Sequence, residues 1–97
     1  MEDTKFESKL RSHVLKTDPE VFEASLIGLK KYEIRFNDRD FQIGDMINLR
    51  ETKFTGEEMK TGKPLIYTAR TITKIVSHVL EGPIYGLKDG WVILSLV

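Results

Sequence analysis

Turn-forming residues cut this chain into short segments, and this spacing is the feature that most restricts its fold. Runs rich in Gly, Pro, Asn and Asp occupy residues 37–40, 44–45 and 81–90, and residues 53–64 hold two glycines and a proline with few apolar residues. Such residues favour turns because their side chains bond the local backbone or because they permit unusual backbone angles. We therefore expect a fold of short strands, with a long, mobile loop over residues 53–64.

Five of the remaining segments have the composition of β-strands. They are residues 13–16, 31–36, 46–52, 68–80 and 91–97. Residues 68–80 also fit a helical spacing of apolar side chains, but seven of the thirteen are β-branched, which favours a strand. A bulge near Ile75 would keep the apolar face of that strand inward. Residues 91–97 are apolar on both faces, as expected of a central, fully buried strand.

One helix is predicted over residues 19–27. Asp18 precedes it and can cap its first free N–H groups, while Pro19 suits the first helical position because its missing N–H costs nothing there. Gly28 fits the C-terminal stop, because glycine adopts the backbone angles that end a helix. The chain then enters the strand predicted over residues 31–36.

Together these elements predict an α+β, mainly β protein: a small five- to six-stranded β-barrel in which one principal helix covers an opening. A chain of 97 residues is long enough for one hydrophobic core. We expect residues 12–97 to form that single domain. Residues 1–11 are charge-rich and weakly patterned, so we expect an N-terminal extension that is either frayed or a short helix.

Composition excludes several classes of function. The chain has no cysteine, which excludes disulfides, thiolate zinc sites and a cysteine nucleophile. Asp38, Asp40 and Asp45 do not follow the spacing of a calcium-binding loop, so we expect neither a metal nor another cofactor. No apolar run approaches about 18 residues, and the first residues lack the apolar core of a secretion signal. We therefore expect a cytoplasmic protein without a membrane partner.

Charge is balanced overall but uneven along the chain. Fifteen Lys and Arg oppose fifteen Asp and Glu, which excludes nucleic-acid binding through bulk charge. Two segments are nevertheless locally basic: residues 28–39, and residues 60–80, which contain no acid. They are compatible with a phosphate-binding face, although solvated strand surfaces would look the same.

The first basic segment also holds the most specific motif, Gly28-x-Lys30-x-x-x-x-Arg35. Alternation over residues 31–36 predicts a half-buried strand, with Glu33 and Arg35 on its charged face. They lie roughly 6.6 Å apart along the backbone, so they could line one cleft with Lys30. The alternative is a surface Glu–Arg pair of little energetic value.

This motif has the G-x-K-x-x-x-x-R signature of the ASCH domains of the PUA-like superfamily, which the chain resembles over about residues 12–97. The run over residues 37–45 is similar to the N-D-R-x-F-x-x-G-D run of a short bacterial and phage branch of that family. Leu80-Glu81-Gly82, residues 85–87 and residues 91–96 also look like that branch. The resemblance implies a small PUA-like barrel with a cleft beside the helix, and it implies binding of RNA.

The same resemblance raises an enzymatic alternative, because some small ASCH proteins deacetylate acetylated cytidine. Their chemistry uses a lysine, a threonine three positions later and a distant glutamate. Lys30 matches the lysine, but Glu33 stands at the threonine position, which departs from the pattern. Lys30 and Glu33 are therefore only tentative catalytic residues, and Glu81 is a weak candidate for the distant glutamate.

We expect a domain that binds RNA or a nucleotide-like ligand around the motif. The expected binding residues are Gly28, Lys30, Glu33, Arg35, Arg39, Lys63, Arg70 and Lys74. Tyr67, Tyr85 and Trp91 could stack on bases. A small amidohydrolase-like enzyme acting on a modified nucleoside is one alternative. A phage or bacterial protein-interaction module is another, and it predicts an exposed apolar patch.

Overall fold

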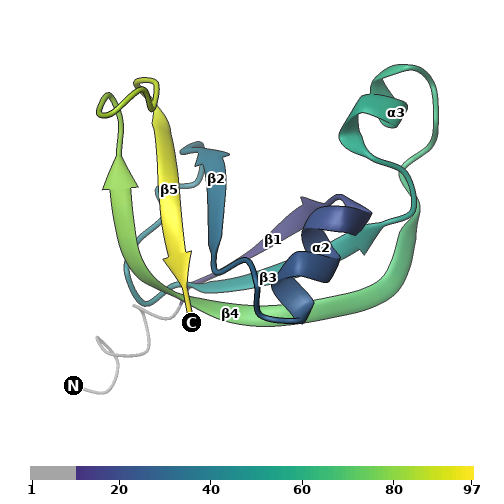
Figure 1. Ribbon diagram of the computed structural model, residues 1–97, viewed down its shortest axis with the longest axis horizontal. Helices are drawn as coiled ribbons and strands as arrows, with labels where there is room; N and C mark the ends of the chain where they lie inside the picture. The colour runs from purple at the N-terminus through teal and green to yellow at the C-terminus, as the bar shows by residue number, and fades with distance from the viewer. Residues whose placement is uncertain (1–10) are drawn as a thin grey trace.

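The computed structural model describes residues 11–97, which fold into five strands and two helices (Figure 1). In chain order the elements are β1 (Ser12–Thr17), α2 (Pro19–Leu26), β2 (Tyr32–Phe36), β3 (Met46–Thr52), α3 (Gly56–Lys60), β4 (Tyr67–Glu81) and β5 (Trp91–Leu96). The mainly β class, the five strands and the helix after Asp18 are confirmed. Residues 1–10 of the extension expected over residues 1–11 lie outside the described residues. Within residues 11–97, no helix is long and apolar enough to cross a membrane.

The strands form one mixed sheet in the order β1-β3-β4-β5-β2. β1 and β3 pair in parallel, and the other three neighbouring pairs are antiparallel. β1 and β2 are the two edges and do not pair with each other, so the sheet is open. The β-barrel expected from the sequence is therefore not confirmed.

The long strand β4 gives the sheet its shape. It pairs with β3 from Tyr67 to Ile75 and with β5 from Val76 to Glu81, so both halves of the sheet share it. Figure 1 shows β4 curving beneath the molecule, with β2 and β5 on one side and β1 and β3 on the other. A register shift between Val76 and His78 lies beside the bulge predicted near Ile75. Bulges increase strand bending, which turns one half of the sheet toward the other.

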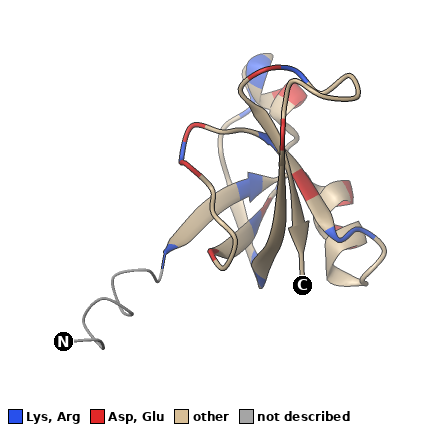
Figure 2. Cartoon of the chain, turned by 90° about the vertical axis from the view of Figure 1, so that its left-hand side faces the viewer, with Lys and Arg blue, Asp and Glu red and all other residues tan. Residues whose placement is uncertain are grey.

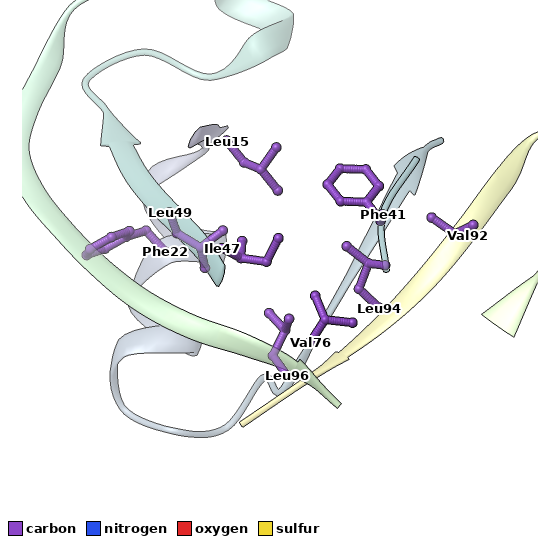
Figure 3. Packing of buried hydrophobic residues seen from close by; sticks show 9 residues of the cluster. All are labelled: Leu15, Phe22, Phe41, Ile47, Leu49, Val76, Val92, Leu94 and Leu96. Atoms are coloured by element: carbon purple, nitrogen blue, oxygen red, sulfur yellow. The ribbon is translucent and has the colours of Figure 1, made fainter. Parts of the chain in front are cut away.

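The hydrophobic core fills the space between the two halves (Figure 3). Its nine buried residues come from four strands (β1, β3, β4 and β5), from helix α2 and from the β2–β3 connection: Leu15, Phe22, Phe41, Ile47, Leu49, Val76, Val92, Leu94 and Leu96. Burial of one such side chain contributes about 1.5–3 kcal/mol. The core therefore joins β1, on one half of the sheet, to β5, on the other half, while β2 is held by its backbone ladder with β5.

Strand β5 is central but only half-buried, so the expectation of a fully buried strand is wrong. Val92, Leu94 and Leu96 are buried, whereas Trp91 is 37% exposed. The cause is the single layer of the sheet at this point. Helix α2 packs against β3, on the other half (Figure 1). The apolar outer positions of β5 therefore remain accessible.

Helix α2 begins and ends nearly where expected, but its cap differs. Asp18 has extended backbone angles at the N-cap and makes no side-chain cap hydrogen bond to α2. Its Oδ1 instead accepts a hydrogen bond from the N–H of Gly56, at 3.0 Å. The side chain expected to cap α2 therefore joins the start of α3 to the β1–α2 junction.

Residues 53–64 are not loop throughout, contrary to expectation, because α3 forms within them. Thr55 accepts a hydrogen bond from the N–H of Glu58, and the Glu58 carboxylate accepts one from the N–H of Thr55. This capping box satisfies two backbone donors at the start of the helix. The T-x-x-E sequence indicates a helix start, but the sequence-based prediction gave more weight to the nearby glycines and proline.

Candidate functional site

The turn after α2 places Lys30 at the edge of the sheet. Gly28 has a φ of +84°, a conformation that glycine adopts without strain. The N–H groups of Leu29 and Lys30 both donate to the carbonyl of Ala24, each at 3.0 Å. These bonds fold the chain back against the end of α2. Gly28, a predicted binding residue, thus sets the direction of the motif.

Lys30, Glu33 and Arg35, which the sequence suggested could line one cleft, form one connected ion cluster. The Nζ of Lys30 lies 2.5 Å from Oε2 of Glu33 and also donates to the carbonyl of Tyr32. The Nε and Nη2 of Arg35 lie 3.0 and 2.9 Å from Oε1 of Glu33. The Glu33 side chain is only 4% exposed, so this carboxylate is held between two cations away from bulk water.

The burial of Glu33 reverses the usual orientation of a half-buried strand. Tyr32, Ile34 and Phe36 are 46%, 50% and 53% exposed, whereas the charged positions face the interior. Glu33 lies opposite the buried Leu94 of β5. Burying a lone carboxylate is costly, but two neighbouring cations offset that cost. The Glu–Arg pair is therefore not the weak surface pair of the alternative interpretation.

Two arginines bridge the gap between the edge strands. The Nη2 of Arg35 donates to the carbonyl of Lys16 at 2.9 Å, and the Nη1 of Arg39 donates to the carbonyl of Val14 at 2.6 Å. Both acceptors belong to β1, whose outer edge has no neighbouring strand. Side chains thus provide hydrogen bonds where a closed barrel would have a backbone ladder.

An open groove of about 400 Å³ lies over this cluster. One wall is the β1–α2 junction, from Lys16 to Asp18, together with Val21. The other wall is β2 from Tyr32 to Arg35, and Lys30 joins it from the turn. A volume of this size suits a nucleoside-sized ligand. Of the predicted binding residues, the groove brings together Lys30, Glu33 and Arg35.

Sequence reasoning missed several residues of the groove. Asp18 was assigned to helix capping and Tyr32 to a strand face, while Lys16 carried no local signal. All three line the groove because β1 and β2 approach each other across the open sheet edges. Tyr32 was the one that could have been found, since it lies inside the motif. Its ring contacts the Nζ of Lys30, at 4.7 Å from the ring centre.

Arg70 lies in a separate cluster outside the groove. It donates to both carboxylate oxygens of Glu51, at 3.0 Å each, and to Glu23 at 2.9 Å. Its guanidinium also lies 5.0 Å from the centre of the Phe22 ring. The pKa of Glu51 is lowered by the hydrogen bonds that it accepts, first from Arg70 and then from Thr68. The pKa of Arg70 is raised by the hydrogen bonds that it donates, first to Glu51 and then to Glu23. These contacts join β4 to β3 and α2.

The structure does not bring Lys63 or Lys74 into the groove either. Lys63 lies after α3, with its Nζ 5.3 Å from the centre of the Phe54 ring, and Lys74 lies opposite Ile47 on the β3–β4 ladder. Figure 2 shows Lys and Arg on several separate elements, interspersed with Asp and Glu. Lys63, Arg70 and Lys74 of the second basic segment therefore do not extend the face that the motif forms.

Asp45, one of the three aspartates considered for a calcium-binding loop, has structural partners instead. His13 is buried, and its Nε2 lies 2.8 Å from Oδ2 of Asp45, which also accepts a hydrogen bond from the N–H of Gln42. The His13 ring contacts the edge of Phe41 at 4.8 Å between ring centres. Across residues 11–97, no three His, Cys, Asp or Glu side chains are grouped so that they could hold a metal ion.

The fold and the groove define a small, mainly β domain with an open five-stranded sheet and an ion cluster between its edge strands. A protein-family model described as a domain of unknown function (DUF3850) matches residues 12–96, and the chain belongs to this family. The description states no activity and no ligand. No curated protein matches the chain at a significant level.

Proposed function

We propose that this domain binds a nucleotide or a short piece of RNA in the groove over Lys30, Glu33 and Arg35. The observation that carries the proposal is the buried Glu33 carboxylate, held by two cations at the base of an open, nucleoside-sized groove. A fold that only needed stability would gain as much from apolar side chains at this position. A buried polar cluster beside open space is instead typical of a binding site.

The cluster keeps hydrogen-bonding capacity for a ligand. Among the residues described, Arg35 uses Nε and Nη2 for its partners, which leaves Nη1 for an acceptor in the groove. Lys30 has three N–H groups and uses two of them, on Tyr32 and Glu33. Donors of this kind suit phosphate oxygens and base carbonyls. Glu33 has further lone pairs that suit the N–H groups of a base.

An exposed aromatic ring completes the arrangement. Tyr32 is 46% exposed and lines the groove beside Lys30. Bases stack on tyrosine rings irrespective of their identity, and such stacking is a common mode of RNA recognition. Kinship with the ASCH domains, proposed from the G-x-K-x-x-x-x-R motif, supports the same ligand class. The sheet of this chain is open, so that kinship rests on the motif and on the order of elements.

Equilibrium binding of a mixed-sequence RNA pool of six nucleotides tests the proposal. Wild type should bind, and its affinity should fall with salt because bound phosphates release counterions. Lys30→Ala and Arg35→Ala should each weaken binding by at least tenfold. Lys74→Ala serves as the matched control, since it removes a lysine outside the groove. Equal affinities for all four proteins, or no binding by wild type, would overturn the proposal.

One distance favours a second candidate, an amidohydrolase-like enzyme acting on a modified nucleoside. This reaction needs Lys30 and Glu33 in the same cleft, and their side chains lie 2.5 Å apart. The pair could pass a proton between the lysine and the carboxylate during attack on an amide. Incubation with acetylated cytidine, followed by mass spectrometry, separates the candidates. Deacetylation that is lost in Glu33→Gln supports the enzyme, and an unchanged substrate excludes this activity.

A further inference from the structure

Two more hollows adjoin the groove, and both share residues with it. One, of about 300 Å³, continues past Ile34 and Arg35 to Phe36, Arg39 and Trp91. The other, of about 450 Å³, continues past Lys16, Asp18 and Arg35 to Met59 and Lys60 of α3. Arg35 lines all three spaces. The groove is therefore the middle part of a longer channel that follows the open side of the sheet between β1 and β2.

Exposed aromatic rings lie in two of the three spaces. Tyr32 lines the groove, and Phe36 and Trp91 line the hollow beyond Ile34. Phe36 is 53% exposed, and its ring meets that of Trp91 edge to face, 6.0 Å apart. Tyr32 and Phe36 lie four residues apart on one strand, which is about 13 Å. The spacing provides two separate stacking positions.

The channel also has a local excess of positive charge on a neutral protein. Five Lys or Arg residues line the three spaces, against three Asp or Glu residues. Glu33 is already neutralised by Lys30 and Arg35. Lys60, at the far end, is 76% exposed and forms an exposed ion pair with Glu57 at 3.6 Å. Cations distributed along a channel suit a ligand with several phosphates in a row.

We infer that the channel takes a single-stranded RNA segment of two or three nucleotides, and that a mononucleotide fills only its middle part. This inference rests on the proposed function. One base stacks on Tyr32 and the next on Phe36, with Arg35 at the phosphate between them. Lys60 receives the phosphate on the α3 side. A mononucleotide leaves the Phe36 hollow and the α3 hollow unused, so it should bind more weakly.

The test compares mixed-sequence RNA pools of one, two, three, four and six nucleotides, measured by titration calorimetry with the full chain. Affinity should rise by at least tenfold from one nucleotide to three and then stay level. If a mononucleotide binds as tightly as a trinucleotide, the inference is wrong while the proposed function stands. If no pool binds at any length, the proposed function fails, and the inference fails with it.

Two aromatic variants distinguish a stacking channel from general attraction of RNA. Tyr32→Ala should weaken every pool that binds, whereas Phe36→Ala should weaken only pools of two nucleotides or more, each by about tenfold. Tyr85→Ala is the matched control, because Tyr85 is 92% exposed and lines none of the three spaces. Thermal unfolding shows that each variant is folded. An effect of Tyr85→Ala equal to that of Phe36→Ala would contradict the inference.

Discussion

The ammonium group of Lys30 lies 2.5 Å from the buried carboxylate of Glu33, and this contact ties the turn after α2 to the interior of the sheet. The partners are only three positions apart in the chain, yet one side chain starts from a turn and the other faces the core. Lys30 therefore wraps around the edge of β2. The same contact neutralises Glu33 and leaves one lysine N–H directed to the groove.

Removing the charge of Glu33 should destabilise the domain. Glu33→Gln leaves Lys30 and Arg35 close together without their shared anion, and these cations are only 16% and 28% exposed. We expect the free energy of unfolding to fall by about 1–3 kcal/mol, measured by urea denaturation. Glu57→Gln is the control, since the Glu57 side chain is 88% exposed and its ion pair with Lys60 should contribute little. Equal losses in both variants would contradict a special role for Glu33.

Gly28→Ala should disturb the motif without a steric clash. No atom lies within 4 Å of the position that a Cβ would take, so the cost comes from the φ of +84° alone. We expect a loss of about 1–2 kcal/mol in stability and weaker RNA binding, because Lys30 shifts with the turn. Gly56→Ala is the comparison, since Gly56 lies in α3 and its nearest contact is at 4.0 Å. A full loss of binding with unchanged stability would show that Gly28 itself touches the ligand.

Asp18→Ala should loosen α3 more than α2. Asp18 accepts a hydrogen bond from Gly56, and it makes no side-chain bond to its own helix. Hydrogen exchange should therefore quicken over residues 55–60, with a stability loss of about 0.5–1.5 kcal/mol. Asp18→Asn keeps an acceptor oxygen and should largely restore protection. Faster exchange confined to residues 19–26 would instead support the capping role that the sequence suggested.

Stability should depend on pH through Glu51. Its folded-state pKa is lowered below the ordinary 4.5, first by hydrogen bonds from Arg70 and then from Thr68. Such a group stabilises the fold above its unfolded pKa, and that stabilisation is lost as pH falls through the folded value. The difference in melting temperature between wild type and Glu51→Gln should therefore be largest near neutral pH and shrink toward pH 3. A difference that grows on acidification would contradict this assignment.

Much of the fold was predictable because local signals and burial agree along the chain. Asp18-Pro19 marked the start of the helix, and β-branched residues marked β4 despite their helical spacing. Whether the sheet closes into a barrel or stays open was not predictable, because this depends on how far β4 bends. Residues 53–64 were predicted to be a loop, but the Thr55–Glu58 capping box stabilises a short helix there despite the flanking glycines.

The candidate site was likewise predictable only where local sequence determines the position of a side chain. The spacing of Lys30, Glu33 and Arg35 indicated that they could line one cleft, because one turn and one strand position all three. The predicted roles of Lys63, Arg70 and Lys74 rested on local charge alone, and charge does not determine the direction of a side chain. Arg70 shows the difficulty, because its partner Glu51 lies nineteen residues away in the chain. The alternating pattern also did not predict the orientation of β2, because its charged face, with Glu33, points to the interior.

The most direct test of the account is a two-dimensional NMR titration of the labelled domain with short RNA. The account predicts that the largest shifts fall on residues 16–21, 28–35 and the side-chain Nε–H of Arg35, and that Lys30→Ala abolishes them. Signals of Lys63 and of Arg70 should stay nearly unchanged. Shifts centred on residues 63–80, or shifts that persist in Lys30→Ala, would contradict a binding site in this groove.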